Sequence, residues 1–417
     1  MNEVWILLPE TIPILRTRRR SSIEVDPETA TLYFENFIYP LRAEYDVIVE
    51  CEYGGNFGNG WKISSFPENL DSFPLTVKVY DEWGVLLSEK SCRIELIDKS
   101  FTANEYRLLC IGDSMTHRHG YVYHVANKLA NVKMIGTRSF NGVIYHEGRG
   151  GWTLTRYMKQ YADWWGGASP FVFPKQVAGK DYYGDMPYME RLKTPELDSY
   201  SLDGYTSEQI SEGQIYHEGG KLMRIENGQA VCFDAAPEWE FDFGKYMERF
   251  KLEKPDCISI LMGANDLQNT SYEDSDARVK QFMSELETMI KSIHEYDKSI
   301  EIVVNLPAPG AEQYAWGLRG NSSSKRYRLN LLKLTKALID RWDGRQKEHV
   351  FVCAMRHFVD PVYGFDMGGE RANSYSNCVT VHQNNWVHPS ISGYDQMGDA
   401  LAATVQKIRK QLNDLLA

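Results

Sequence analysis

The chain has 417 residues, of which 57 are acidic and 46 basic, so its formal net charge at pH 7 is −11 and its pI is about 5.5. This charge excludes a chain-wide attraction to phosphate backbones, and we expect no nucleic-acid partner. With 43% hydrophobic and 25% charged residues, the composition excludes a disordered chain, and the length suits one large domain with a smaller companion, or two or three domains.

Neither the cysteines nor the N-terminal segment indicates export. The seven cysteines are scattered and never occur in C-x-x-C spacing, which argues against a disulfide framework and against a zinc site. Cys110 and Cys257 lie in apolar runs and are predicted to be small core residues. The N-terminus lacks the pattern of a signal peptide, and no apolar run approaches membrane-spanning length. We therefore expect a reduced, cytoplasmic protein without a membrane partner, unless a signal peptide has been removed.

Residues 1–102 are predicted to form an accessory β-sandwich domain. Its clearest feature is a hairpin, in which residues 81–84 (DEWG) separate two alternating β-rich runs. Strands at such regular spacing are typical of a small antiparallel sandwich. The basic segment 16–22 (RTRRRSS) is predicted to be a solvated strand or loop, with binding of an acidic polymer as the alternative. The predicted strands lie within residues 31–40, 45–53, 60–67 and 75–97.

From residue 103 to 417 the pattern changes to strands that alternate with helices. Each predicted strand is a nearly continuous apolar run, which is typical of parallel strands covered on both faces. The sequence therefore predicts an α/β domain built on a parallel sheet. The predicted strands are residues 106–114, 131–137, 256–266, 300–309 and 349–359, and the predicted helices are residues 119–130, 277–297, 327–344 and 392–416.

Ser114 directly follows the first strand of this domain, in the segment LLCIGDSM. The carboxyl ends of the strands in an open parallel sheet form the ligand crevice, so Ser114 lies where a nucleophile would act. A serine hydroxyl needs a base that takes its proton, and the oxyanion that forms needs preorganised donors. Asp113 is predicted to support this loop by hydrogen bonding rather than to act as the base.

The sequence supplies candidates for these tasks, each placed after another strand. Gly151 in EGRGGWT offers a backbone N–H that no side chain obstructs, and Asn265 in GAND offers a side-chain amide to an oxyanion. His388 precedes the last helix and can reach the same crevice as general base. Asp266 is predicted to support the Asn265 loop. Each of these segments alone is weak evidence, since loops, helix caps and turns have similar sequences.

In the order Ser, Gly, Asn, His, these segments resemble the four blocks of the SGNH (GDSL-like) hydrolase family. The matching segments are GDSMT, GRGGWT, GAND and NNWVHPSISGY. The resemblance covers about residues 105 to 415, except for an aromatic insertion within this range. It implies a flavodoxin-like three-layer α/β/α sandwich with a parallel sheet, and an esterase mechanism centred on Ser114 and His388. It also implies an oxyanion hole formed by the N–H groups of Ser114 and Gly151 with the Asn265 side chain. The G-x-S-x-G elbow of the α/β-hydrolases is not present around Ser114.

One position departs from the family pattern. The last block is usually Asp-x-x-His, but Asn385 stands in the place of the Asp. An Asn amide oxygen could accept the same hydrogen bond from His388 without supplying a charge. Three outcomes stay open: Asn385 orients His388 in a working dyad, a carboxylate such as Asp360 or Asp366 takes over, or activity is lost. We favour the working enzyme.

The insertion, at about residues 160–250, interrupts the alternation with an aromatic and Gly-rich stretch. Trp164 and Trp165 within it, and Trp152 directly after the proposed oxyanion glycine, are predicted to contact substrate. The alternative for these side chains, and for Tyr182 and Tyr183, is that they form the core of the insertion.

The segment HRHGYVYH is predicted not to bind a metal. His117 and His119 would fall on different faces of a helix, and His124 brings no further obvious ligand. The three histidines are therefore predicted to be polar residues at the start of a helix near the mouth of the crevice.

Together these residues predict a serine esterase that needs no cofactor and acts on small-molecule or oligosaccharide esters, with O-acetyl groups on carbohydrate as the favoured substrates. One alternative is a lipid or thioester hydrolase of the same fold. Another is a glycan-binding protein with weak catalysis, whose β domain and altered site only recognise sugar. For residues 1–102 we favour a structural role.

Overall fold

The computed structural model describes residues 3–16, 29–99, 104–117, 120–139, 142–159, 169–174, 215–218, 221–235, 239–311, 324–383 and 385–416.

The larger part of the molecule is built on a parallel sheet. β10 is its central strand, with β11 and then β13 along one side and β19, β20 and β21 on the other. This order corresponds to the 2-1-3-4-5 arrangement of flavodoxin-like folds. A short β12 extends the sheet in antiparallel pairing with β13. The strands are β10 (Tyr106–Gly112), β11 (Val132–Ile135), β12 (Arg138–Ser139), β13 (Tyr145–Gly148), β19 (Cys257–Leu261), β20 (Glu301–Asn305) and β21 (Val350–Cys353).

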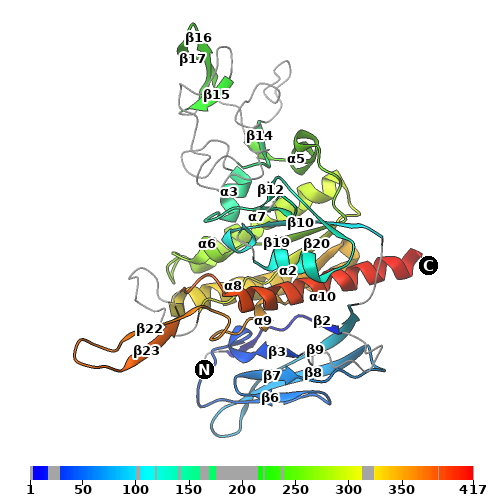
Figure 1. Ribbon diagram of the computed structural model, residues 1–417, viewed down its shortest axis with the longest axis vertical. Helices are drawn as coiled ribbons and strands as arrows, with labels where there is room; N and C mark the ends of the chain where they lie inside the picture. The colour runs from blue at the N-terminus through cyan, green and yellow to red at the C-terminus, as the bar shows by residue number, and fades with distance from the viewer. Residues whose placement is uncertain are drawn as a thin grey trace.

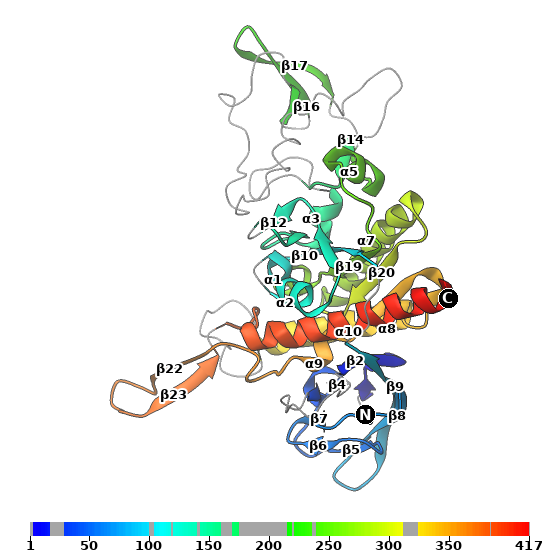
Figure 2. The same ribbon diagram turned by 45° about the vertical axis from the view of Figure 1, so that its right-hand side comes forward.

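The sheet strands are buried because helices cover both faces (Figures 1 and 2). α2 packs on α10, while α3, α5 and α8 pack on α7, so the helices form two groups. Cys110 and Cys257 are fully buried, which confirms that they are core residues. No described helix is long and apolar enough to cross a membrane. The longer helices are α2 (Tyr121–Lys128), α3 (Leu154–Lys159), α5 (Phe243–Phe250), α7 (Ser275–Tyr296), α8 (Ser324–Trp342) and α10 (Ile391–Leu416).

The N-terminal strands form separate sheets beside α10 (Figure 2). One sheet has the order β2-β9-β8-β5, another the order β3-β7-β6, and β1 pairs with β4. The rings of Trp61 and Phe73, one from each of the two larger sheets, have centroids 6.4 Å apart. The strands are β1 (Trp5–Ile6), β2 (Thr11–Arg16), β3 (Ala30–Tyr33), β4 (Ile38–Tyr39), β5 (Asp46–Glu50), β6 (Gly55–Phe57), β7 (Gly60–Ile63), β8 (Ser72–Tyr80) and β9 (Leu86–Asp98), with a 3-10 turn η1 (Phe34–Asn36).

The predicted hairpin at residues 81–84 is confirmed. β8 and β9 are antiparallel, and the N–H of Gly84, at φ 78°, donates to the carbonyl oxygen of Asp81. The prediction of a purely antiparallel arrangement is wrong, because β2 pairs with β9 in parallel. No tight turn joins these two strands, so the local turn signals do not determine their direction.

Another difference concerns residues 349–359, which were predicted to be a strand. β21 ends at Cys353, and Met355–Phe358 form the short helix α9, whose side chains are all buried. Two other short helices, α1 (Ser114–His117) and α6 (Ala264–Leu267), follow β10 and β19 directly.

Two segments extend from this body. The described parts of the insertion contain β14 (Val172–Pro174) paired with β18 (Trp239–Phe241), and the three-stranded sheet β15 (Ile215–Glu218), β16 (Lys221–Glu226) and β17 (Gln229–Ala235). The hairpin of β22 (Met367–Arg371) and β23 (Val379–Gln383) projects from the body shortly before α10 (Figure 1). A second 3-10 turn, η3 (Gln346–Glu348), precedes β21.

Candidate active site

Ser114 lies at the junction between β10 and α1, where the chain packs too tightly for a side chain at position 112. A Cβ on Gly112 would lie 2.0 Å from Thr116 Oγ1 and 2.8 Å from the carbonyl oxygen of Leu261. The carbonyl oxygen of Asp113 accepts hydrogen bonds from the N–H groups of Thr116 and His117 and starts the helical turn. Glycine at this position therefore lets α1 begin directly at the strand end, with the Ser114 side chain partly exposed.

The structure brings Ser114 and His388 into direct contact although 274 positions separate them. His388 Nε2 lies 2.7 Å from Ser114 Oγ. Both side chains are partly exposed, whereas their neighbours Asp113, Met115 and Val387 are buried. A substrate can therefore reach the two reactive atoms while the residues behind them keep the loops in place.

Asn385 lies behind His388, but its amide oxygen does not face the imidazole, as it would have to in order to accept a hydrogen bond from the ring. Asn385 Oδ1 accepts the backbone N–H groups of Val387 at 3.0 Å and His388 at 2.9 Å. The amide nitrogen, Nδ2, is the atom that faces His388 Nδ1, at 3.2 Å. Of the possibilities left open by the sequence, a hydrogen bond from the imidazole to the amide oxygen is not the one formed, because two backbone donors occupy that oxygen.

Asn265 joins the loops that follow β10, β13 and β19. It lies in α6 after Gly263, whose φ of 116° makes the turn out of β19. Its Nδ2 donates to the carbonyl oxygen of Trp152 at 3.0 Å and lies 3.4 Å from Asp113 Oδ2, a long and weak contact. The Asn265 amide thus lies next to both the Ser114 loop and the Gly151 loop.

The Gly151 loop is held beside the end of β10. The N–H of Arg149 donates to the carbonyl oxygen of Gly112 at 2.9 Å, and Gly148 lies so close to α1 that a Cβ there would be 2.4 Å from the His117 nitrogen. Gly151 itself is partly exposed and has a φ of 74°, a conformation that favours glycine.

Two buried carboxyl groups flank Asn265. Burial raises the pKa of Asp113 to about 7, and the N–H of Met115, which donates to Oδ1, opposes the shift. Burial likewise raises the pKa of Asp266 to about 7, against the attraction of Arg278. Asp113 thus makes a hydrogen bond within the nucleophile loop. Asp266, the neighbour of Asn265 in α6, accepts the N–H of Leu154 and so ties the Asn265 loop to the start of α3.

The prediction that Trp152 contacts substrate is wrong. Its side chain is fully buried, and its ring packs against Tyr157 with centroids 5.1 Å apart. Large apolar area favours this interior position over an exposed stacking platform. Trp164, Trp165, Tyr182 and Tyr183 lie outside the described residues.

The alternative carboxylates are engaged or located elsewhere. Asp360 Oδ2 accepts the hydroxyl of Tyr33 at 2.9 Å, and its Oδ1 accepts the N–H groups of Val362 and Tyr363. Asp366 is exposed. The Asp360 carboxylate thus ties this loop to the N-terminal strands.

The described histidines of the segment HRHGYVYH have different neighbours. The ring of His117 contacts the ring of His146 edge-on, whereas His124 contacts Asp395 and Asp399 of α10. His119 lies outside the described residues. Within the described ranges, no group of three or more His, Cys, Asp or Glu could hold a metal ion.

A buried ion pair that was not predicted from the sequence lies behind the Gly151 loop. Arg149 Nη2 lies 3.2 Å from Glu147 Oε2, and both side chains are almost completely buried. Glu147 Oε1 also accepts the hydroxyl of Tyr246 at 2.8 Å and the N–H of Thr137 at 2.7 Å. The sequence contains a signal for this ion pair. Glu147 and Arg149 have opposite charges and stand two positions apart in HEGRGG, which places both side chains on one face of an extended segment.

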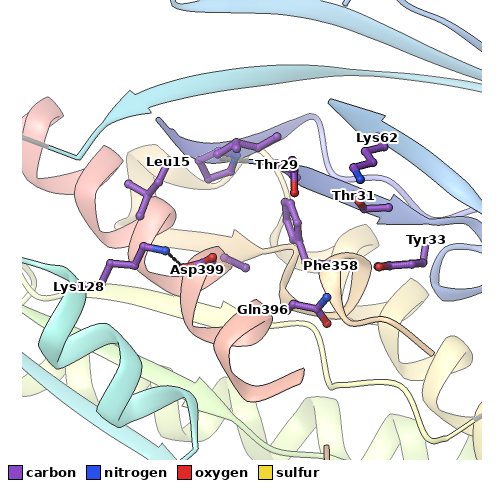
Figure 3. Close-up of a pocket in the computed structure, with 13 residues that line it drawn as sticks. Leu15, Thr29, Thr31, Tyr33, Lys62, Lys128, Phe358, Gln396 and Asp399 are labelled. Atoms are coloured by element: carbon purple, nitrogen blue, oxygen red, sulfur yellow. Dashed lines mark hydrogen bonds and ion pairs between the residues drawn. The ribbon is translucent and has the colours of Figure 1, made fainter. Parts of the chain in front are cut away.

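A cavity of about 390 Å³ lies away from these residues, between the N-terminal strands β2 and β3 and the helices α2 and α10 (Figure 3). Tyr33 and Thr31 line it from one side and Gln396 and Asp399 from the other, and Lys128 pairs with Asp399 at its wall. Its lining residues include neither Ser114 nor His388. The cavity therefore marks where the N-terminal strands meet the α/β part.

The chain is similar to several known proteins. The sequence model of the family described as GDSL-like Lipase/Acylhydrolase matches residues 108–401. The structure is similar to a carbohydrate esterase family 3 protein from Talaromyces cellulolyticus, with 11% identity over 73% of this chain and 99% of that chain and a TM-score of 0.37. It is also similar to a carbohydrate acetylesterase family member from Sinorhizobium meliloti (13% identity, 73% and 99% of the two chains, TM-score 0.35). A further similar structure is the M. smegmatis aryl esterase (12%, 72% and 100%, TM-score 0.34). No curated protein matches the sequence.

Proposed function

Because the chain belongs to the GDSL-like lipase and acylhydrolase family, we propose that it is a serine esterase that hydrolyses carboxylic esters at Ser114 and His388, with O-acetyl groups on carbohydrate as its substrates. The observation that carries this proposal is the 2.7 Å contact between Ser114 Oγ and His388 Nε2. Nucleophilic catalysis requires this contact, since the base must receive the hydroxyl proton as the oxygen attacks.

In the proposed reaction, Ser114 Oγ attacks the ester carbonyl carbon and its proton passes to His388 Nε2. The carbonyl electron pair moves onto oxygen and forms a tetrahedral oxyanion. When this intermediate collapses, the bond to the alcohol oxygen breaks and the alcohol leaves with the proton from His388. Water then attacks the acyl carbon and gives a proton to His388. The bond between this carbon and Ser114 Oγ breaks, the acid leaves, and Ser114 Oγ takes the proton from His388.

The oxyanion is proposed to bind the backbone N–H groups of Ser114 and Gly151 and the side-chain amide of Asn265. One hydrogen of Asn265 Nδ2 is engaged by the carbonyl oxygen of Trp152. The other has only the weak 3.4 Å contact with Asp113, so it is the hydrogen that can turn to a developing negative charge. Donors that are already in place stabilise the transition state most effectively.

The choice of carbohydrate as substrate is supported by the composition of residues 160–250. This stretch is rich in aromatic residues, glycine and polar residues. Aromatic rings with polar neighbours suit sugar rings, whereas a hydrolase of long-chain lipids or thioesters would need a long apolar groove.

The test is acetate release from p-nitrophenyl acetate and from a panel of acetylated oligosaccharides. We expect the wild-type protein to release acetate from at least one class of oligosaccharide. Ser114→Ala should reduce kcat by about 10³-fold or more, because it removes the nucleophile. Ser284→Ala is the matched control: this serine is exposed on α7, outside the four segments that resemble the family blocks, and loss of its hydroxyl should leave the rate unchanged.

Equal rates for the wild type and Ser114→Ala would contradict the proposed nucleophile. Release from long-chain esters or thioesters alone would replace carbohydrate with the alternative substrate class. Binding of acetylated glycan without acetate release would favour a glycan-binding protein, a function that the orientation of the Asn385 amide also favours.

A further inference from the structure

The orientation of the Asn385 amide is fixed by the backbone around it. Oδ1 accepts two N–H groups, those of Val387 and His388, at 3.0 and 2.9 Å. Rotating the amide by half a turn would place its NH₂ group against these two donors and would lose both hydrogen bonds. The oxygen therefore stays with the backbone, and the NH₂ group stays with the His388 ring.

This orientation decides which ring nitrogen of neutral His388 carries the hydrogen. An amide NH₂ group can only donate, so His388 Nδ1, at 3.2 Å from Asn385 Nδ2, must accept. A neutral imidazole has a single N–H, which is then on Nε2. Nε2 lies 2.7 Å from Ser114 Oγ, so in this state the imidazole donates to the serine oxygen instead of accepting its proton.

We propose that Asn385 is a positioning residue that holds His388 in the tautomer protonated at Nε2 and thereby slows the esterase reaction. This inference rests on the proposed function of Ser114 and His388. The attack on an ester needs a lone pair on Nε2, so each turnover must first move a proton from Nε2 to Nδ1 and displace the Asn385 NH₂ group. The resting state is therefore unproductive, and the productive tautomer is a minor one.

A carboxylate at position 385 would reverse this preference with no other change in the contacts. One oxygen would keep the N–H groups of Val387 and His388, and the second would accept a hydrogen from Nδ1, which leaves the Nε2 lone pair facing Ser114. The opposite replacement, Asp by Asn, in a serine protease keeps the geometry but favours the wrong tautomer and lowers kcat about 10⁴-fold.

The first experiment reads the tautomer directly and does not depend on activity. Protein labelled with ¹⁵N on its histidines is examined by NMR at about pH 8.5, where an ordinary imidazole with a pKa of about 6.5 is neutral. The His388 signals are identified by comparison with His388→Asn. We expect hydrogen on Nε2 in the wild type and on Nδ1 in Asn385→Asp. Hydrogen on Nδ1 in the wild type would overturn the inference and leave the proposed function untouched.

The second experiment compares rates of acetate release. Asn385→Asp is expected to raise kcat/KM by about 10²- to 10⁴-fold. Asn377→Asp is the matched control, since it adds the same charge at an exposed position of the β22–β23 hairpin, where Asn377 accepts a hydrogen bond from Arg371, and it should change the rate less than about 2-fold.

The two proposals fail in different ways. An Asn385→Asp rate equal to or below that of the wild type, with Ser114→Ala inactive, overturns the inference alone. If wild-type protein and Asn385→Asp both release no acid from any ester but show the expected NMR tautomers, the proposed function is overturned and only the tautomer assigned to His388 stands.

Discussion

At the scale of single residues, Asp113 and Asp266 place two protonatable carboxyl groups directly beside the candidate oxyanion donor Asn265. Both are almost completely buried, and burial raises the pKa of each to about 7. The positive charge of Arg278, 3.1 Å from Asp266, stabilises the ionised form of that carboxyl group, whereas the N–H of Met115 stabilises the ionised form of Asp113. Around neutral pH, the native protein therefore binds protons that an unfolded chain would release.

We expect Asp113→Asn to flatten the pH dependence of stability. The folded-state pKa of about 7 lies above the unfolded value of about 3.9. Between these values the native state binds the extra proton, so the free energy of unfolding falls as pH rises, by up to about 1.4 kcal/mol per pH unit for one group. Urea unfolding at pH values from about 5 to 7 measures this slope, which should be smaller in the variant.

The control is Asp366→Asn, which removes an exposed carboxylate at the base of the β22–β23 hairpin. It should leave the slope as in the wild type. Parallel pH dependences for the wild type and Asp113→Asn would show that Asp113 is ionised alike in both states.

Single residues could be predicted from the sequence where a motif fixed their place in the backbone. They could not be predicted where tertiary packing sets the orientation or burial of the side chain. The segments around Ser114 and His388 led to the expectation that the two residues meet, and their side chains are in contact. The orientation of the Asn385 amide could not be predicted, because it depends on two backbone N–H groups whose direction only the folded loop sets. The burial of Trp152 depends in the same way on Tyr157, which belongs to the next helix.

At the scale of elements, a cluster of charged side chains connects α2 and α10 on one face of the sheet. Asp399 accepts hydrogen bonds from His124 and Lys128, and Asp395 contacts the other ring nitrogen of His124 at 3.0 Å. Burial alone would raise the pKa of Asp399, but His124 and Lys128 outweigh it and lower the pKa. Since α10 begins just after the His388 loop, this cluster also anchors one end of that loop.

We expect Asp399→Asn to destabilise the protein at neutral pH by about 1 kcal/mol, a modest value because the carboxylate is half exposed. A lowered folded-state pKa gives stability that is present above the unfolded value of about 3.9 and is lost as pH falls through the folded value. The difference between wild type and variant in urea unfolding should therefore shrink as the pH is lowered from 7 toward about 3.

Asp414→Asn is the matched control, because Asp414 is an exposed carboxylate near the end of the same helix. It should cause no loss of stability. A destabilisation by Asp399→Asn that stays constant down to about pH 3 would mean that packing, rather than charge, joins the helices.

Elements with strong periodicity could be predicted, and elements defined by distant partners could not. The apolar run of β10 and the amphipathic pattern of α7 are local properties, and both elements lie where the sequence predicts them. By contrast, the parallel pairing of β2 with β9 and the helical turn at α9 are set by segments far away in the chain. Local propensity carries no information about such partners.

At the scale of the whole molecule, the N-terminal strands and the α/β part share a buried polar interface. Asn36 Nδ2 donates to the carbonyl oxygens of Arg356 and Val359 at 2.8 and 2.7 Å, and Arg356 Nε donates to the carbonyl oxygen of Asn36. His357 stacks on Phe37, with ring centroids 5.4 Å apart. The side-chain donors of Asn36 and Arg356 therefore each depend on backbone carbonyl oxygens of the other part of the chain.

Burial at this interface disfavours the charged forms of His357 and Arg356. Burial lowers the pKa of His357 to about 3, so the ring is neutral, and its Nε2 donates to the carbonyl oxygen of Leu7 at 2.6 Å. Burial, together with the nearby Arg328, also lowers the pKa of Arg356 to about 9. The segment from Arg356 to Asp360 is therefore hydrogen-bonded to the N-terminal strands on one side, and on the other side the N–H of Asp360 donates to the side-chain oxygen of Gln396 in α10.

This arrangement predicts that the chain unfolds as one cooperative unit. Asn36→Ala removes the side-chain donor that the buried carbonyl oxygens of Arg356 and Val359 share, which costs about 1–3 kcal/mol. We expect differential scanning calorimetry to show a single transition, with equal calorimetric and van't Hoff enthalpies, that moves down by about 1–3 °C in the variant. Asn56→Ala, on the exposed strand β6 of the same N-terminal part, should leave the midpoint within about 0.5 °C. Two separate transitions, with only one of them moved by Asn36→Ala, would show instead that the N-terminal strands fold independently and that their contacts with α9 do not stabilise the α/β part.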